Sequence, residues 1–71
     1  MNNYNREFGK RICNARKNLG MTMKELGKKV GLHESTIQRY ESGEIKTLDI
    51  EKAREFSEAL RVSSVYLMGW E

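Results

Sequence analysis

The sequence predicts an all-α fold, with five short helices in a single domain that spans residues 1–71. Apolar residues recur at spacings of three and four in several stretches, and no stretch alternates as a strand would. The chain contains six glycines and no proline, and glycines stand where the helical patterns stop. A chain of 71 residues can bury only a small core, which suits helices joined by short turns.

The first helix is predicted at about residues 5–18. Phe8, Ile12, Ala15 and Leu19 recur at spacings of four, three and four, which places them on one face. Gly20 follows and is expected to stop the helix.

Two further helices are predicted at about residues 23–30 and 34–42, joined by a tight turn. Thr22 and Glu25 have the spacing of a capping box, which favours a helix start. Gly31 can take a positive φ and redirect the chain at the end of the second helix. Two short helices joined in this way form a helix-turn-helix unit.

The fourth helix is predicted at about residues 48–60, with Thr47 as its N-cap. Its expected buried stripe is Ile50, Ala53, Phe56 and Leu60. The fifth helix is expected at about residues 64–68, after a serine cap.

Charge is unevenly distributed along the chain. The net charge is +3, but residues 1–46 hold ten Lys/Arg and five Asp/Glu (+5), whereas residues 47–71 hold three and five (−2). The positive part contains the helix-turn-helix pattern. This asymmetry indicates a polyanionic partner, although a lysine-rich surface can also simply be solvated.

The composition argues against several classes of protein. One cysteine, Cys13, and one histidine, His33, cannot provide a metal site or a nucleophile–base pair. Apolar runs are only a few residues long, so no membrane span is expected. We therefore expect no enzyme activity, no metal, no cofactor and no membrane partner.

The segment from Met21 to Gly43 resembles the DNA-binding core of the lambda-repressor-like (Cro/CI, XRE) regulators of bacteria and phages. The shared residues follow the pattern MT–EL–––VGL–––TI–RYESG, and the resemblance extends from about Arg6 to Trp70. It implies a five-helix lambda-repressor-like domain, with the third helix in the major groove of double-stranded DNA. It also implies a cytoplasmic, nucleoid-associated transcriptional regulator, most commonly a repressor.

The resemblance assigns DNA contacts to residues of this chain. Base contacts would come from Glu34, Ser35, Thr36, Gln38 and Arg39. Phosphate contacts would come from Thr22, Met23, Lys24, Ser42, Lys46 and Thr47. Methionine at position 23 replaces the family's usual glutamine, and Glu44 stands where a lysine or arginine is common. His33 replaces the usual serine or threonine cap, and histidine caps poorly, so we expect either a less stable start to the third helix or compensation by Thr36.

The resemblance also implies a structural ion pair and an assembly. Arg16 would pair with Glu41 and lock the first helix against the end of the third. Two copies would form a homodimer on an operator with an inverted repeat. The apolar end of the chain, with Tyr66, Met68 and Trp70, would serve either as a dimer contact or as part of the core.

A second function remains compatible with the same residues. An antitoxin-like partner or adaptor could use the helix-turn-helix to dock on a protein, with the acidic second part of the chain as its surface. The salt dependence of DNA binding distinguishes the two functions, because phosphate contacts weaken steeply as salt rises.

Overall fold

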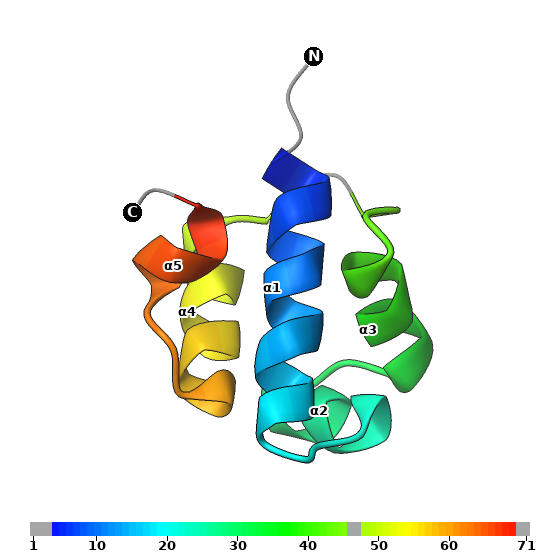
Figure 1. The fold of residues 1–71 in the computed structure, drawn as a ribbon. Helices are drawn as coiled ribbons and strands as arrows, with labels where there is room; N and C mark the ends of the chain where they lie inside the picture. The colour runs from blue at the N-terminus through cyan, green and yellow to red at the C-terminus, as the bar shows by residue number, and fades with distance from the viewer. Residues whose placement is uncertain (1–3, 46–47, 70–71) are drawn as a thin grey trace.

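The computed structural model describes residues 4–45 and 48–69, which form five helices and no strand. They are α1 (Tyr4–Asn18), α2 (Met23–Val30), α3 (Glu34–Glu41), α4 (Ile50–Leu60) and α5 (Ser64–Met68). Helix α1 lies in the middle of the molecule, with α3 on one side and α4 and α5 on the other (Figure 1). The predicted all-α class is confirmed.

All five helices contribute to one hydrophobic core. The largest fully buried side chains are Phe56, Ile12, Leu26, Ile37, Leu60 and Leu67. The ring of Tyr40 lies between two phenylalanines, with its centroid 6.1 Å from that of Phe8 and 5.2 Å from that of Phe56. Because these rings come from α1, α3 and α4, aromatic packing joins α3 both to α1 and to α4.

The turn between α2 and α3 depends on two glycines. Gly31 caps α2 with φ of 73°, and its amide donates to the Gly27 carbonyl. A Cβ at Gly27 would lie 2.3 Å from the Leu32 carbonyl oxygen, so only glycine permits this approach. The amide of Leu32 also donates to the Gly27 carbonyl, at 2.8 Å. The helix-turn-helix is therefore held by its backbone as well as by its core.

The structure corrects the predicted start of α4. The helix begins at Ile50, and its N-cap is Asp49, whose carboxylate accepts from the Lys52 amide at 2.7 Å. Thr47, the predicted cap, lies outside the described residues. Ile50 is 72% exposed, and Leu48, before the helix, enters the core instead. Apolar spacing predicted the opposite, because Ile50 lies three residues before Ala53 and continues the helical stripe, whereas Leu48 is buried from the segment before the helix, where helical spacing does not apply.

Leu19 is a second correction. Helix α1 ends at Asn18 and Gly20 takes a φ of 66°, so the chain turns away before Leu19 can follow the helical face. Leu19 is 43% exposed. Phe8, Ile12 and Ala15 are buried as predicted.

Candidate nucleic-acid interface

The outward side of α3 presents a row of polar side chains. Ile37 and Tyr40 face the core, which turns the opposite side of the helix to solvent. Of the residues assigned to base contacts, Glu34, Ser35, Gln38 and Arg39 are exposed and Thr36 is half-buried. We call these five residues the recognition rim.

His33 is the N-cap of α3, although histidine is not among the preferred capping residues. Its Nδ1 accepts from the Ser35 amide at 3.0 Å and lies 2.9 Å from the Ser35 hydroxyl oxygen. The ring nitrogen thus satisfies one of the first-turn amides, as a serine oxygen would. For this bond the Nδ1 atom must be unprotonated, because only then is it an acceptor.

The start of α2 combines a closed cap with free helix-end donors. Thr22 and Glu25 form the predicted capping box, with the Thr22 amide donating to the Glu25 carboxylate at 2.7 Å and the Glu25 amide donating to the Thr22 hydroxyl at 3.0 Å. Hydrogen bonds to the Glu25 carboxylate from the Thr22 amide, and then from the Thr22 side chain, hold its pKa below the ordinary value. The amides of Met23 and Lys24 precede the first intrahelical bond, so they point out of the helix end, where an anion is favoured.

The other residues assigned to phosphate contacts differ in their surroundings. Lys24 is exposed, whereas the Met23 side chain is partly buried against the core. Ser42 is exposed, and its hydroxyl donates to the Arg39 carbonyl at 3.1 Å. Lys46 and Thr47 lie outside the described residues.

An ion pair joins α1 to the end of α3. Arg16 Nε and Nη2 donate to the two carboxylate oxygens of Glu41, at 2.7 and 3.1 Å, and the two side chains are only 10% and 6% exposed. Arg16 Nη1 also donates to the Met21 carbonyl at 2.8 Å, in the connection to α2. The hydrogen bonds that Arg16 donates to Glu41 raise the pKa of Arg16 above its ordinary value, against the effect of burial. Arg16 therefore joins three parts of the fold that position the recognition rim.

Two contacts around α3, one at Gly9 and one at Glu44, were not predicted from the sequence. Gly9 lies where α1 meets α3, and a Cβ there would be 2.4 Å from the Tyr40 carbonyl oxygen. Glu44 carries a carboxylate that accepts from Arg39 Nε at 3.2 Å. A sequence signal exists for Glu44, since it departs from the basic residue common at its position, but its partner is evident only in three dimensions.

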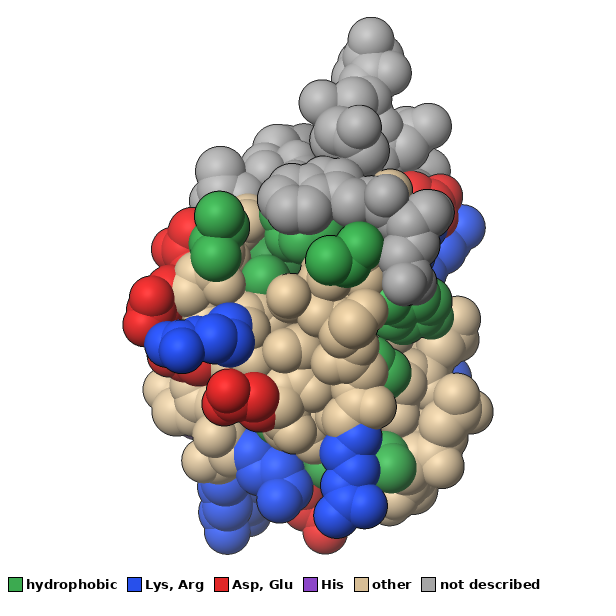
Figure 2. Space-filling model, turned by 90° about the vertical axis from the view of Figure 1, so that its left-hand side faces the viewer, with side chains coloured by type: hydrophobic (Ala, Val, Ile, Leu, Met, Phe, Trp, Pro, Cys, Tyr) green, Lys and Arg blue, Asp and Glu red, His purple; other side chains and the backbone are tan. Residues whose placement is uncertain are grey.

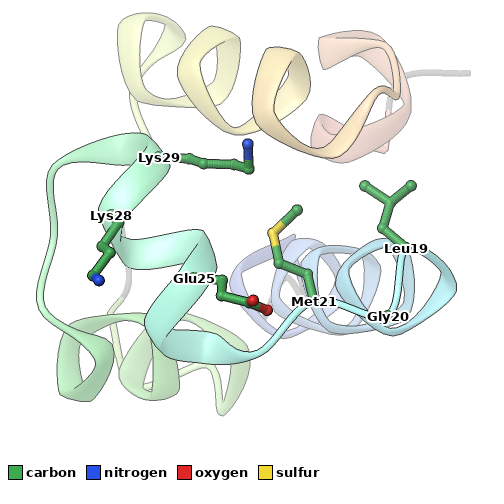
Figure 3. A pocket seen from close by; sticks show the side chains of 6 residues that line it. All are labelled: Leu19, Gly20, Met21, Glu25, Lys28 and Lys29. Carbon is green, nitrogen blue, oxygen red and sulfur yellow. The ribbon is translucent and has the colours of Figure 1, made fainter.

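A surface hollow of about 420 Å³ lies between the end of α1 and α2, away from the recognition rim. It is lined by Leu19, Gly20, Met21, Glu25, Lys28 and Lys29. Figure 3 shows the Leu19 and Met21 side chains at this hollow, while Lys28 points away from it. The Glu25 carboxylate already accepts the Thr22 amide. The hollow therefore offers no convergent set of polar groups.

The described part of the chain shows no cluster of three or more His, Cys, Asp or Glu side chains that could hold a metal ion. No helix among residues 4–45 and 48–69 is long and apolar enough to cross a membrane.

Comparisons with known proteins agree with this geometry. The P22 c2 repressor, whose structure was solved with a synthetic operator, is 33% identical to this chain and has a TM-score of 0.80. The match covers 90% of this chain and 96% of the repressor chain. Bacillus thuringiensis PlcR, whose structure was solved with the peptide PapR7 and DNA, shares the fold at 22% identity and a TM-score of 0.76. The match covers 87% of this chain and 21% of the PlcR chain. Among curated proteins, no sequence matches this chain. A helix-turn-helix family model matches residues 14–67. The chain belongs to the helix-turn-helix family of the lambda-repressor-like (XRE, Cro/CI) type.

Proposed function

We propose that this protein is a sequence-specific regulator of transcription that binds double-stranded operator DNA and represses by covering a promoter. The observation that supports this most is that the recognition rim is exposed on α3. That helix is capped by His33 and is held to α1 by the ion pair between Arg16 and Glu41. The P22 c2 repressor, with 33% identity, was solved in complex with a synthetic operator. The proposed role needs neither catalysis nor a cofactor, and it places the protein on nucleoid DNA in the cytoplasm.

Helix α3 would read base edges in the major groove. Arg39 can donate two hydrogen bonds to guanine O6 and N7, which is worth about 1–3 kcal/mol of discrimination. Gln38 can pair with adenine, and Ser35 can donate or accept. Glu34 can accept from cytosine N4, and Thr36 lies at the margin of the rim.

Helix α2 would fix the protein on the DNA backbone. The Met23 and Lys24 amides and the Thr22 hydroxyl lie together at the start of α2, where a phosphate oxygen is favoured. The Lys24 ammonium and Ser42 would add contacts that carry no sequence information. Lys46 and Thr47 are proposed for the same role on the resemblance alone.

A homodimer on an inverted repeat would place two copies of α3 in successive major grooves, about 34 Å apart. The face that carries α4 and α5 is the proposed contact, since its hydrophobic side chains gather toward one end (Figure 2). Ile50 is 72% and Val65 41% exposed. Tyr66 and Met68, which the sequence suggested for this contact, are partly buried against the core, and Trp70 lies outside the described residues.

Selection of bound fragments from a random DNA pool tests the proposal. We expect enrichment of one inverted repeat, with half-sites one helical turn apart, and a steep loss of affinity as salt rises. Failure to enrich any sequence, together with salt-independent binding, would contradict the proposal and favour the adaptor function.

A further inference from the structure

Helix α3 ends in a Schellman motif that fixes Glu44 beside Arg39. Gly43 takes a φ of 82°, its amide donates to the Tyr40 carbonyl at 3.1 Å, and the Glu44 amide donates to the Arg39 carbonyl at 2.9 Å. In this motif the residue after the glycine commonly makes a hydrophobic contact with the residue four positions before the glycine. Here those two positions hold Glu44 and Arg39, and the contact is an ion pair.

The backbone therefore determines where the Glu44 carboxylate lies. It accepts from Arg39 Nε at 3.2 Å, and the two side chains are 57% and 58% exposed. Ion pairs as exposed as this contribute little to stability. Arg39 belongs to the recognition rim, and Glu44 follows the end of α3 and contacts it there. The pair therefore contributes little to folding, and both side chains are exposed where a ligand of α3 can reach them.

We propose that Glu44 is a specificity-determining residue that positions Arg39 for a guanine. This inference rests on the proposed function, in which Arg39 faces DNA bases. Within the described residues the pair engages only Nε of Arg39. Nη1 and Nη2 can then donate side by side to guanine O6 and N7, which is the commonest specific contact in DNA readout.

The charge of Glu44 acts in the same direction. A carboxylate beside the guanidinium offsets part of its attraction for phosphate oxygens, because like charges repel and phosphate binding is mainly electrostatic. Random DNA offers Arg39 mostly phosphates, whereas the operator offers a guanine edge. Glu44 thus weakens binding to random DNA more than binding to the operator.

Variants at position 44 test this inference on the intact protein. Fluorescence anisotropy would give the dissociation constants for the selected operator and for random DNA of the same length. We expect Glu44→Ala to lower the ratio of the two affinities about two- to five-fold, the range of a lost exposed ion pair. Glu44→Gln keeps an acceptor oxygen but not the charge, so its ratio should lie between those of wild type and Glu44→Ala.

Two comparisons make the result specific. Glu51 forms an exposed ion pair with Arg54 at 3.2 Å on α4, so Glu51→Ala removes a similar pair and should leave the ratio unchanged. In an Arg39→Ala background, Glu44→Ala should no longer change the ratio. Equal melting temperatures of wild type and Glu44→Ala would show that folding is unaffected.

The outcomes separate this inference from the proposed function. If Arg39→Ala lowers the ratio but Glu44→Ala raises both affinities equally, Glu44 acts only as a repelling charge and the inference is wrong. If Arg39→Ala itself leaves the ratio unchanged, Arg39 does not read a base, and both the inference and that part of the proposed function are wrong.

Discussion

The Arg16 guanidinium holds both carboxylate oxygens of Glu41, at 2.7 and 3.1 Å, in a nearly buried position between α1 and the end of α3. A planar guanidinium suits this geometry, since its donors match a carboxylate in pairs. The third bond, to the Met21 carbonyl at 2.8 Å, extends the same contact to the connection before α2. The ion pair therefore determines how the recognition rim is held against the rest of the molecule.

Arg16→Ala should lower the free energy of unfolding by about 3 kcal/mol, because it leaves the Glu41 carboxylate buried and unpaired. In a domain of this size the melting temperature should fall by roughly 12–24 °C. Arg54→Ala is the matched control, since its ion pair with Glu51 is exposed, and it should change stability by no more than about 0.5 kcal/mol. Thermal unfolding followed by circular dichroism measures both. Equal melting temperatures for Arg16→Ala and wild type would show that the ion pair between Arg16 and Glu41 does not stabilise the fold.

Gly9→Ala should destabilise the fold, although alanine normally favours a helix over glycine by about 1 kcal/mol. The new methyl would lie 2.4 Å from the Tyr40 and 2.9 Å from the Glu41 carbonyl oxygens, so α1 and α3 must separate. We expect a net loss of about 1–3 kcal/mol in denaturant unfolding. The neighbouring exposed Lys10→Ala should be close to neutral. A more stable Gly9→Ala variant would mean that the two helices are not this close.

His33→Ala should cost about 1 kcal/mol of stability, since the Ser35 amide loses its acceptor at Nδ1. His33→Asn should retain most of this energy, because an amide oxygen can accept the same bond. Chemical denaturation of the three proteins at neutral pH provides the comparison. An alanine variant as stable as the asparagine variant would show that His33 does not cap α3.

Glu25 should make stability depend on pH in the acid range. Hydrogen bonds from the Thr22 amide and then the Thr22 side chain to the Glu25 carboxylate hold its pKa below the ordinary value in the folded state. Its contribution is therefore fully present above the ordinary pKa of the unfolded chain and is lost as pH falls through the lower folded pKa. Glu25→Gln should show a smaller loss of stability over this window. If the free energy of unfolding fell equally with decreasing pH in Glu25→Gln and in wild type, Glu25 would make no such contribution.

The helix-turn-helix was predictable because its signals are local. Thr22 and Glu25 form a capping box within one turn, and Gly31 stops α2 two residues before the cap of α3. Spacing of apolar residues then gave the buried sides of both helices. Each of these features depends on residues only a few positions apart.

The errors lie where the outcome depends on tertiary contacts. Leu48 and Ile50 are equally apolar, and only packing against the core decides that Leu48 is buried and Ile50 is exposed. The proximity of Gly9 to Tyr40 depends on residues 31 positions apart in the sequence. The capping by His33 is a different case: Ser35 is only two residues away, but the bond depends on the position of Nδ1 beside the Ser35 amide, a geometry that propensity does not specify.

The DNA contacts on the recognition rim remain predictions, and a comparison of two variants tests them most directly. Arg39→Ala removes a proposed base contact, and Lys24→Ala removes a proposed phosphate contact. Both side chains are exposed, so neither change should disturb the core. Affinities for the selected operator and for random DNA should be measured at several salt concentrations.

Arg39→Ala should weaken binding to the operator by about 5- to 150-fold, corresponding to the 1–3 kcal/mol of a bidentate base contact, and change binding to random DNA far less. Lys24→Ala should weaken both to a similar degree and reduce the salt slope by about 0.9. Equal losses on operator and random DNA for Arg39→Ala would contradict base reading by the outward side of α3.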